Sequence, residues 1–299
     1  MRKIYTGIWS PMPTPLDSTG EIDVKKIPEL VDYLLEGGVD GLFPLGTTGE
    51  FAFLSEEERH LMIKGVVDST NGRVPVAAGI SDTSIERVIR NAKDAEQLGV
   101  DAVVATPPFY FSVGEEGIYN FVSTISNRTN IPLILYNIPD YTRNPVSVDL
   151  LRRMIDEELI VAMKYTENNL SKLIQYLRAS NSRISIFNGT FALTYSCLSF
   201  GGSGSVISVA NIDPKNASRI YDAFRTGRLK EAAKTQLELA KVDQILSVGV
   251  FPAAMKYAME LLGQKVGGPK PPIPPLSDSE KTIVKRLLAE AKLLESAHR

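Results

Sequence analysis

Histidine and cysteine are scarce in this sequence. Its 299 residues include two histidines, His60 and His298, and one cysteine, Cys197. A single cysteine excludes a disulfide within the chain and is typical of a reducing compartment. Two histidines give little support to a Ser-His-Asp or Cys-His catalytic site, and they argue against a zinc site of histidine and cysteine ligands. No cluster of carboxylates follows the apolar runs either, so we expect no metal and no cofactor.

Long apolar runs and a strong net charge are also absent. No run of about 18 apolar residues occurs that could cross a membrane as a helix. The formal net charge of -2 gives no reason to expect binding to nucleic acid. Residues 1–6 lack the apolar core of a signal peptide. We therefore expect a cytoplasmic protein that binds neither membranes nor nucleic acid.

Apolar, β-branched runs alternate with segments of helical period in the first 226 residues. Eight such units favour a (β/α)8 barrel over the alternative, an open doubly wound sheet, because no dinucleotide fingerprint is present. From Gly227 on, only helical periods occur, which predicts a barrel domain at residues 1–226 and a helical region at 227–299. The predicted strands are 5–9, 41–45, 74–79, 102–106, 133–137, 160–164, 184–188 and 205–209. The predicted helices include 24–35, 56–67, 85–98, 148–156, 229–246, 253–262 and 277–296.

Reactive residues lie where predicted strands end, which is where barrel enzymes of this kind place their active sites. Lys164 ends the sixth predicted strand, Tyr136 lies at the end of the fifth, and the segment GTTGE at 46–50 follows the second. An amine among apolar neighbours loses its proton more readily than one in water, and it can then attack a ketone to form a Schiff base. Singly, each residue also has an ordinary explanation as a solvated charge, a packed ring or a turn. Their shared position at one edge of a sheet favours a catalytic site.

Three motifs together resemble the dihydrodipicolinate synthase / N-acetylneuraminate lyase superfamily. They are GTTGE at 46–50, Tyr136-Asn137-Ile138-Pro139, and the strand-end Lys164, and the resemblance extends over nearly the whole chain. It implies a (β/α)8 barrel with a helical C-terminal tail. It also implies a lyase, a metal-independent class I aldolase that joins pyruvate to a second substrate or releases it. In such enzymes the imine carbon withdraws electrons, so the adjacent carbon can become an enamine that attacks an aldehyde.

The resemblance implies a role for each candidate residue. Lys164 would form the Schiff base with pyruvate or another 2-keto acid, and Tyr136 would move protons to and from the intermediates. Thr47 would link Tyr136 to a second tyrosine, Tyr110, which in the family reaches into a neighbouring subunit's site. The pyruvate carboxylate would be held by Thr47 and Thr48. The expected substrate-binding residues are Thr48, Thr166, Gly189, Val206 and Tyr141.

The residues expected around the second substrate depart from the synthase pattern. In dihydrodipicolinate synthases an arginine lies two residues after the tyrosine motif and binds the carboxylate of the aldehyde, whereas this chain has Tyr141 there and Arg143 two residues farther on. At Thr166, two residues after the lysine, the chain resembles sialic acid lyases and 2-keto-3-deoxy sugar acid aldolases. The segment that follows Gly189 lacks the acidic side chains with which sialic acid lyases bind sugar hydroxyls.

The first expectation for the reaction is therefore reversible cleavage of 2-keto-3-deoxygluconate-type sugar acids into pyruvate and glyceraldehyde. The alternatives are 4-hydroxy-tetrahydrodipicolinate synthase, which condenses pyruvate with aspartate semialdehyde, and a related keto-deoxy acid dehydratase. A hypothesis from another class is an inactive barrel that senses keto acids. The expected partners are pyruvate with a small aldehyde or a 2-keto-3-deoxy sugar acid. The resemblance also implies a homotetramer, a dimer of dimers, with Tyr110 at the tight interface.

Overall fold

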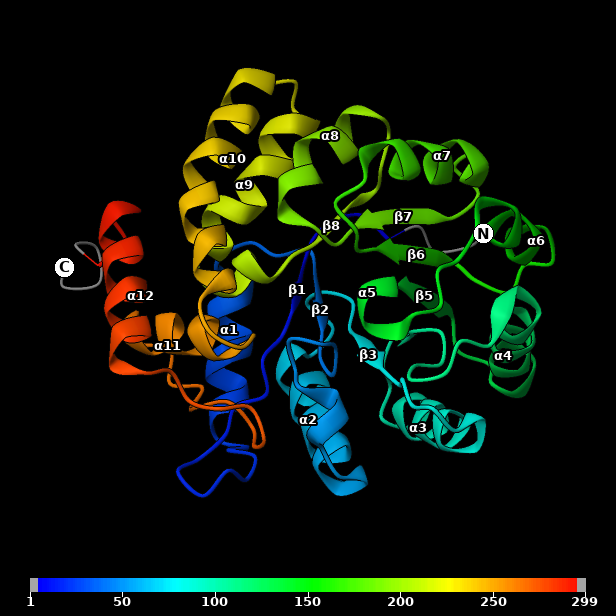
Figure 1. Cartoon of the computed structure of the whole chain (residues 1–299), viewed down its shortest axis with the longest axis horizontal. Helices are drawn as coiled ribbons and strands as arrows, with labels where there is room; N and C mark the ends of the chain where they lie inside the picture. The colour runs from blue at the N-terminus through cyan, green and yellow to red at the C-terminus, as the bar shows by residue number, and fades with distance from the viewer. Residues whose placement is uncertain (1–4, 295–299) are drawn as a thin grey trace. The chain divides into compact units, whose positions relative to one another are not determined.

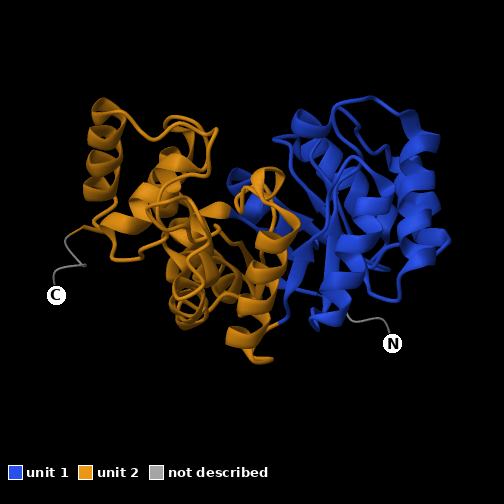
Figure 2. Ribbon diagram, turned by 90° about the horizontal axis from the view of Figure 1, so that it is seen from below, with its two compact units in different colours: residues 1–7, 75–207 blue, residues 8–74, 208–299 orange. Residues whose placement is uncertain are grey.

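The computed structural model of the chain describes residues 5–294; His298 lies outside them. The chain divides into two units, each assembled from separate parts of the sequence (Figure 2). Unit 1 comprises Met1–Gly7 and Pro75–Ile207, and unit 2 comprises Ile8–Val74 and Ser208–Arg299. Each unit is described by itself below.

Eight strands belong to one sheet, and each is followed along the chain by a helix (Figure 1). This order confirms the predicted fold class, a (β/α)8 barrel with a C-terminal helical part. The strands are short, and every strand residue is buried, as expected for a parallel sheet that is covered on both faces. The strands are β1 (Gly7–Pro11), β2 (Gly41–Phe43), β3 (Ala77–Gly79), β4 (Ala102–Ala105), β5 (Leu133–Asn137), β6 (Ala162–Tyr165), β7 (Ser185–Asn188) and β8 (Gly204–Val206).

Unit 1 contains six strands in the order β8-β7-β6-β5-β4-β3, and the neighbours within it run parallel. The register sets Tyr136 of β5 beside Lys164 of β6. Lys164 is the penultimate residue of its strand, not the last as predicted. The apolar run 160–164 starts before β6 begins and stops one residue before β6 ends. The helices of unit 1 are α3 (Ile85–Gln97), α4 (Gly114–Arg128), α5 (Pro139–Thr142), α6 (Val148–Asp156), α7 (Leu170–Ser180), α8 (Thr194–Ser199) and the 3-10 helix η2 (Phe191–Leu193).

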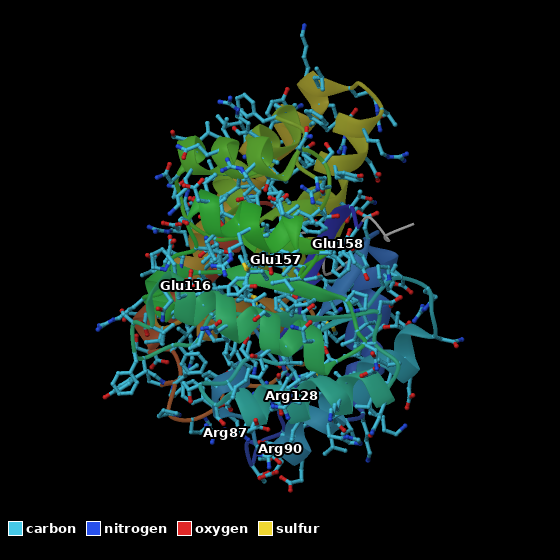
Figure 3. The ribbon with its side chains drawn as sticks, turned by 90° about the vertical axis from the view of Figure 1, so that its right-hand side faces the viewer. Arg87, Arg90, Glu116, Arg128, Glu157 and Glu158 are labelled. Carbon is cyan, nitrogen blue, oxygen red and sulfur yellow. The ribbon has the colours of Figure 1, made fainter. Side chains whose placement is uncertain are left out.

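The outer faces of α3, α4 and α6 carry charged side chains. Arg128 pairs with Glu86 at 2.7 Å, and Arg153 pairs with Glu116 at 2.6 Å. Figure 3 shows this face, with Arg128 labelled near two arginines of α3, and with Glu116 labelled apart from them. All four paired side chains are well exposed, so these ion pairs contribute little to stability. They mark the solvent side of the unit rather than a site.

Unit 2 pairs β1 with β2 in parallel, with Trp9 opposite Gly41. A Cβ atom on Gly41 would lie 2.3 Å from the Trp9 ring, so only glycine fits there. Helix α2 begins with a capping box, because the side chains of Ser55 and Glu58 each accept the other's backbone N–H. The helices of unit 2 are α1 (Lys26–Glu36), α2 (Glu56–Thr70), α9 (Pro214–Arg225), α10 (Leu229–Asp243), α11 (Ala253–Leu261), α12 (Asp278–Glu290) and the 3-10 helices η1 (Phe51–Phe53), η3 (Ser208–Asn211) and η4 (Gln244–Ser247).

Residues 227–294 form helices and turns without any strand, as predicted from their periodicity. The predicted domain boundary falls at Gly227, between α9 and α10, where a backbone φ of 77° suits a glycine. The division into residues 1–226 and 227–299 stays a prediction.

Candidate active site

Two of the predicted catalytic residues of unit 1 lie in direct contact. The Nζ atom of Lys164 lies 4.0 Å from the centre of the Tyr136 ring. Both side chains come from buried strands, and the two residues are only 6% and 4% exposed. The ring face attracts a cationic amine, while the phenol oxygen provides a group that can donate or accept a proton. A buried amine that packs on the ring of a tyrosine provides the two groups, an amine and a hydroxyl, that Schiff-base chemistry needs.

Gly189 and Thr166 adjoin Lys164. A Cβ atom on Gly189 would lie 1.9 Å from Oγ1 of Thr166 and 2.9 Å from Cε of Lys164, so a larger residue would displace both side chains. Backbone hydrogen bonds fix the two positions, because Gly189 donates its N–H to the Tyr165 carbonyl and Thr166 donates its N–H to the Asn137 carbonyl. Oγ1 of Thr166 is buried without a hydrogen-bond partner among residues 5–294. It is a polar group beside the amine that a substrate could satisfy.

Tyr110 lies in the loop after β4, and Tyr141 lies in α5, the short helix after β5. They are 78% and 64% exposed, and the Tyr110 ring meets the Phe111 ring edge to face at 4.9 Å. Partial desolvation raises the pKa of the Tyr141 phenol, and the neighbouring Tyr136 raises that pKa further. Tyr141 therefore lies within electrostatic reach of Tyr136. Val206, the remaining predicted residue of unit 1, is buried at the last position of β8.

Asn144 connects the segment just after α5 to the loop that carries Tyr110, and sequence reasoning missed it. Its Nδ2 donates to the carbonyls of Pro108 and Phe111 at 2.8 and 2.7 Å. Its Oδ1 accepts the N–H of Val113 at 2.9 Å. The residue is 2% exposed, so its amide replaces water as the partner of these backbone groups. The sequence signal was slight, a single Asn-Pro pair in a polar loop.

A second buried network of hydrogen bonds holds residues 138–146. Asn137, the last residue of β5, donates from Nδ2 to the hydroxyl of Tyr176 at 3.1 Å. The Tyr176 hydroxyl in turn donates to the Val146 carbonyl, and the Val146 N–H donates to Oδ1 of Asn137. Residues 138–146 are thus anchored at both ends by a closed set of hydrogen bonds.

The predicted threonines belong to unit 2. Within the turn of residues 46–50, Gly49 donates its N–H to the Gly46 carbonyl at 3.0 Å, and Glu50 donates to the Thr47 carbonyl at 3.1 Å. Thr48 is buried, and its hydroxyl lies 3.0 Å from the hydroxyl of Ser208. The approach of Thr47 and Thr48 to Lys164, in the other unit, stays a prediction.

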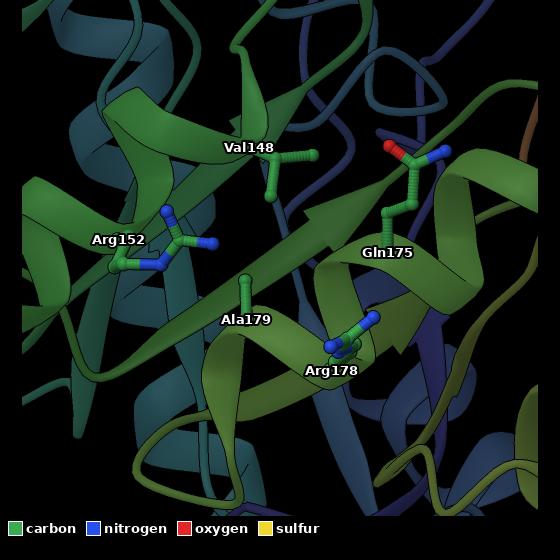
Figure 4. Close-up of a pocket in the computed structure, with 5 residues that line it drawn as sticks. All are labelled: Val148, Arg152, Gln175, Arg178 and Ala179. Carbon is green, nitrogen blue, oxygen red and sulfur yellow. The ribbon is translucent and has the colours of Figure 1, made fainter.

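Other features of the described chain lie apart from these residues. A pocket of about 380 Å³ on α6 and α7 contains none of the predicted site residues (Figure 4). No group of three or more His, Cys, Asp or Glu residues within 5–294 is arranged to hold a metal ion. None of the helices in that range is long and apolar enough to cross a membrane. The residues that line the pocket are Val148, Arg152, Gln175, Arg178 and Ala179.

The sequence pattern of the dihydrodipicolinate synthetase family matches residues 4–291. The chain belongs to this family. The superfamily resemblance seen in the motifs is thereby confirmed, and with it membership in a family of enzymes.

Individual relatives agree with this family assignment. The chain is 32% identical to the 4-hydroxy-tetrahydrodipicolinate synthase of Clostridium novyi (strain NT), over 95% of this chain and 96% of the relative. It is 31% identical to the enzyme of the same name from Bacillus subtilis (strain 168), over 96% and 99%. These names support the synthase alternative better than the 2-keto-3-deoxygluconate aldolase that was expected first.

Solved structures of the family are similar as well. A prophage protein of the dihydrodipicolinic acid synthase family from E. coli K12, in complex with pyruvate, matches with a TM-score of 0.93 and 28% identity, over 97% of this chain and all of that one. Dihydrodipicolinate synthase from Thermotoga maritima matches with the same TM-score and identity, over 98% and 100%.

Proposed function

We propose that the protein is a pyruvate-dependent lyase in which the amine of Lys164 forms a Schiff base with the keto carbon of pyruvate. The observation that carries this proposal is the buried contact between Lys164 and Tyr136 at the ends of β6 and β5. The neutral amine adds to the ketone, and the carbinolamine loses one water to give the imine. The pyruvate methyl group then gives up a proton, and the resulting enamine attacks an aldehyde. The hydroxyl of Tyr136 carries these protons, because it lies on the ring that the Lys164 amine contacts.

The remaining predicted residues have supporting roles in this proposal. Thr47 and Thr48 hold the carboxylate of pyruvate through backbone N–H groups and hydroxyls, and Thr47 relays protons between Tyr136 and Tyr110. Gly189 leaves space beside the lysine, because any side chain there would collide with Lys164. Thr166 offers its unpaired hydroxyl to the substrate, and Val206 borders it from β8.

Borohydride reduction in the presence of pyruvate tests the chemistry directly. Mass spectrometry should find the reduced adduct on the peptide that contains Lys164, and Lys164→Ala should lose both the adduct and turnover while it keeps the fold. Lys172→Ala is the matched control, because Lys172 lies on α7, just past the same strand, with a partly exposed side chain. A wild-type chain that yields no adduct, or an adduct that persists in Lys164→Ala, would contradict the mechanism.

For the second substrate we favour aspartate semialdehyde, because the relatives compared above are named 4-hydroxy-tetrahydrodipicolinate synthase. The chain then has to bind the carboxylate of that aldehyde without an arginine at position 141. Arg143 lies at the end of α5, two residues past Tyr141, with an exposed side chain and a left-handed backbone, φ 57°. It is the guanidinium that this substrate would use, through a charge-assisted pair.

Cleavage of a 2-keto-3-deoxy sugar acid is the second candidate. It is favoured by Tyr141, whose neutral phenol suits a sugar hydroxyl better than a carboxylate, and by the unpaired hydroxyl of Thr166. Assays of the purified protein with both substrate sets decide between the candidates. Rapid condensation of pyruvate with aspartate semialdehyde, lost in Arg143→Ala, supports the synthase. Turnover only with 2-keto-3-deoxygluconate supports the aldolase, and an adduct without any turnover supports a keto-acid sensor.

We also propose a cytoplasmic homotetramer in which Tyr110 enters a neighbouring subunit's site. Support comes from the adjacent rings of Tyr110 and Phe111, which are 78% and 71% exposed in the single chain. Exposed aromatic residues of this kind are enriched at protein interfaces. Light scattering should report a tetramer, and Tyr110→Ala should lower activity. A fully active monomer would rule out the role of Tyr110 across subunits.

A further inference from the structure

The GTTGE turn of unit 2 has a strained backbone. Leu45 and Glu50, at its two ends, have φ angles of 61° and 58°, the left-handed region that side chains other than glycine seldom adopt. Between them, a Cβ atom on Gly49 would lie 3.0 Å from the Leu45 N atom and 3.1 Å from the Met12 carbonyl oxygen. Strain of this kind persists only where the surroundings hold it in place, and it is concentrated at functional sites.

The side chain of Glu50 anchors the turn to the C-terminal part of unit 2. Its carboxylate is completely buried, and Oε1 accepts a hydrogen bond from Nζ of Lys256 at 2.9 Å. Oε2 accepts the backbone N–H of Lys270. The two partners lie in α11 and in the segment that follows it, about 200 positions along the chain from Glu50. Both oxygens of the carboxylate are therefore used.

Lys256 fixes the turn at a second point. Besides Glu50, its Nζ donates to the carbonyl of Thr14 at 3.0 Å. The Thr14 hydroxyl donates to the carbonyl of Gly49 at 2.7 Å. Burial lowers the pKa of the Lys256 amine, and the adjacent Glu50 carboxylate opposes that shift. Lys256 is 0% exposed, so no substrate reaches its amine, and its role differs from that proposed for Lys164.

We propose that Glu50 and Lys256 are positioning residues, whose buried ion pair fixes the backbone of Thr47 and Thr48 in the conformation that receives the carboxylate of pyruvate. This inference rests on the proposed function, in which those threonines bind pyruvate. A carboxylate-binding turn that is already held in place loses little conformational freedom when the ligand arrives. A turn without its ion pair has to be ordered by the ligand, so pyruvate binds more weakly while the chemistry of Lys164 stays the same.

The test measures how much Lys164 adduct borohydride traps as the pyruvate concentration is varied. In Glu50→Gln the half-saturating concentration should rise at least about tenfold, which is about 1.4 kcal/mol, while the adduct yield at saturation stays near that of the wild type. Glu58→Gln is the matched control. Glu58 also pairs with Lys270, through Nζ, but it lies on α2 and outside the turn, so its half-saturation should remain at the wild-type value.

A purely structural role for the ion pair predicts a different result. Glu50→Gln would then unfold more easily, but its folded fraction would bind pyruvate with the wild-type half-saturation, which would overturn the inference and leave the proposed function intact. If Glu50→Gln does not fold, the double variant Glu50→Gln/Lys256→Met carries the test, because it leaves no buried charge unpaired. A half-saturating pyruvate concentration above the wild-type value in that variant supports the inference, and an unchanged concentration refutes it. A wild-type chain without any adduct overturns the proposed function together with this inference.

Discussion

A Cβ atom on Gly189 would lie 2.9 Å from Cε of Lys164, and still closer to the hydroxyl of Thr166. The residue after β7 therefore sets how much space surrounds the amine. The backbone of Gly189 does not need a left-handed conformation, so its requirement for glycine is one of space alone.

We expect Gly189→Ala to lower kcat/KM by at least about tenfold, which is about 1.4 kcal/mol of transition-state stabilisation. The added methyl group displaces the amine from the position at which it attacks the ketone. Steady-state kinetics with pyruvate measure the effect. Gly268→Ala is the control, because a Cβ atom there has nothing within 4 Å and φ is not positive. Normal kinetics in Gly189→Ala would show that the lysine has more freedom than the contact indicates.

Tyr136→Phe should slow turnover by about 10²- to 10⁴-fold, the usual contribution of a positioned proton donor or acceptor. The ring remains as a packing surface for Lys164, so the variant should fold normally and still form an adduct with pyruvate, only more slowly. Rapid-quench trapping measures the rate of adduct formation, and circular dichroism checks that the variant is folded. Turnover close to that of the wild type would assign the proton transfers to another group.

Asn144→Ala should loosen the loop that carries Tyr110. The change leaves the Val113 N–H and the carbonyls of Pro108 and Phe111 without their partner, at a cost of about 1–3 kcal/mol for each buried group that stays unsatisfied. Limited proteolysis should cut near residues 108–113 more rapidly, and urea denaturation should show the loss of stability. Asn144→Asp puts a carboxylate oxygen against the carbonyls of Pro108 and Phe111, so it should loosen the loop at least as much. Identical rates of cleavage in the wild type and both variants would mean that the loop is held by other contacts.

The stability of the fold at high pH should depend on Tyr5. Burial raises the pKa of its hydroxyl to about 12, with a smaller contribution from Asp101, and the hydroxyl donates to the Asp101 carbonyl at 3.1 Å. Since the ordinary value is about 10, the unfolded chain loses this proton first, and stability falls as the pH rises from 10 to 12. The stability difference between the wild type and Tyr5→Phe should therefore shrink by about 1 kcal/mol between pH 9 and pH 11. Urea denaturation at both values measures it, and a constant difference would show that the Tyr5 hydroxyl is solvated.

The sequence was sufficient for the parts of the site that depend on local pattern. Apolar runs located all eight strands, and the contact of Lys164 with Tyr136 follows from two strand ends that are neighbours in a parallel sheet. Strand limits did not follow from the pattern, because apolar residues also occupy the connecting segments next to a strand. The run 160–164 therefore missed Tyr165, the last residue of β6.

Contacts between distant polar residues could not be read from the pattern. Asn144 looks like any other polar residue of a loop. Only folding brings it to the carbonyl of Pro108, 36 positions earlier. Lys256 lies in a segment of helical period, where a lysine is normally solvated, yet it is buried against a carboxylate 206 positions away. Such contacts leave no periodic signal because the partners lie far away in the sequence, at no regular spacing.

The anchoring of Glu50 limits how the GTTGE turn can be reused. Five residues transplanted into another barrel would bring the strained angles of the turn but neither Lys256 nor the backbone N–H of Lys270, which hold its carboxylate. A fragment that ended before α11 would likewise keep the motif and lose its support. The motif can therefore be transferred only together with the C-terminal helical region. That region is part of the structure of the turn, although it is remote from it in sequence.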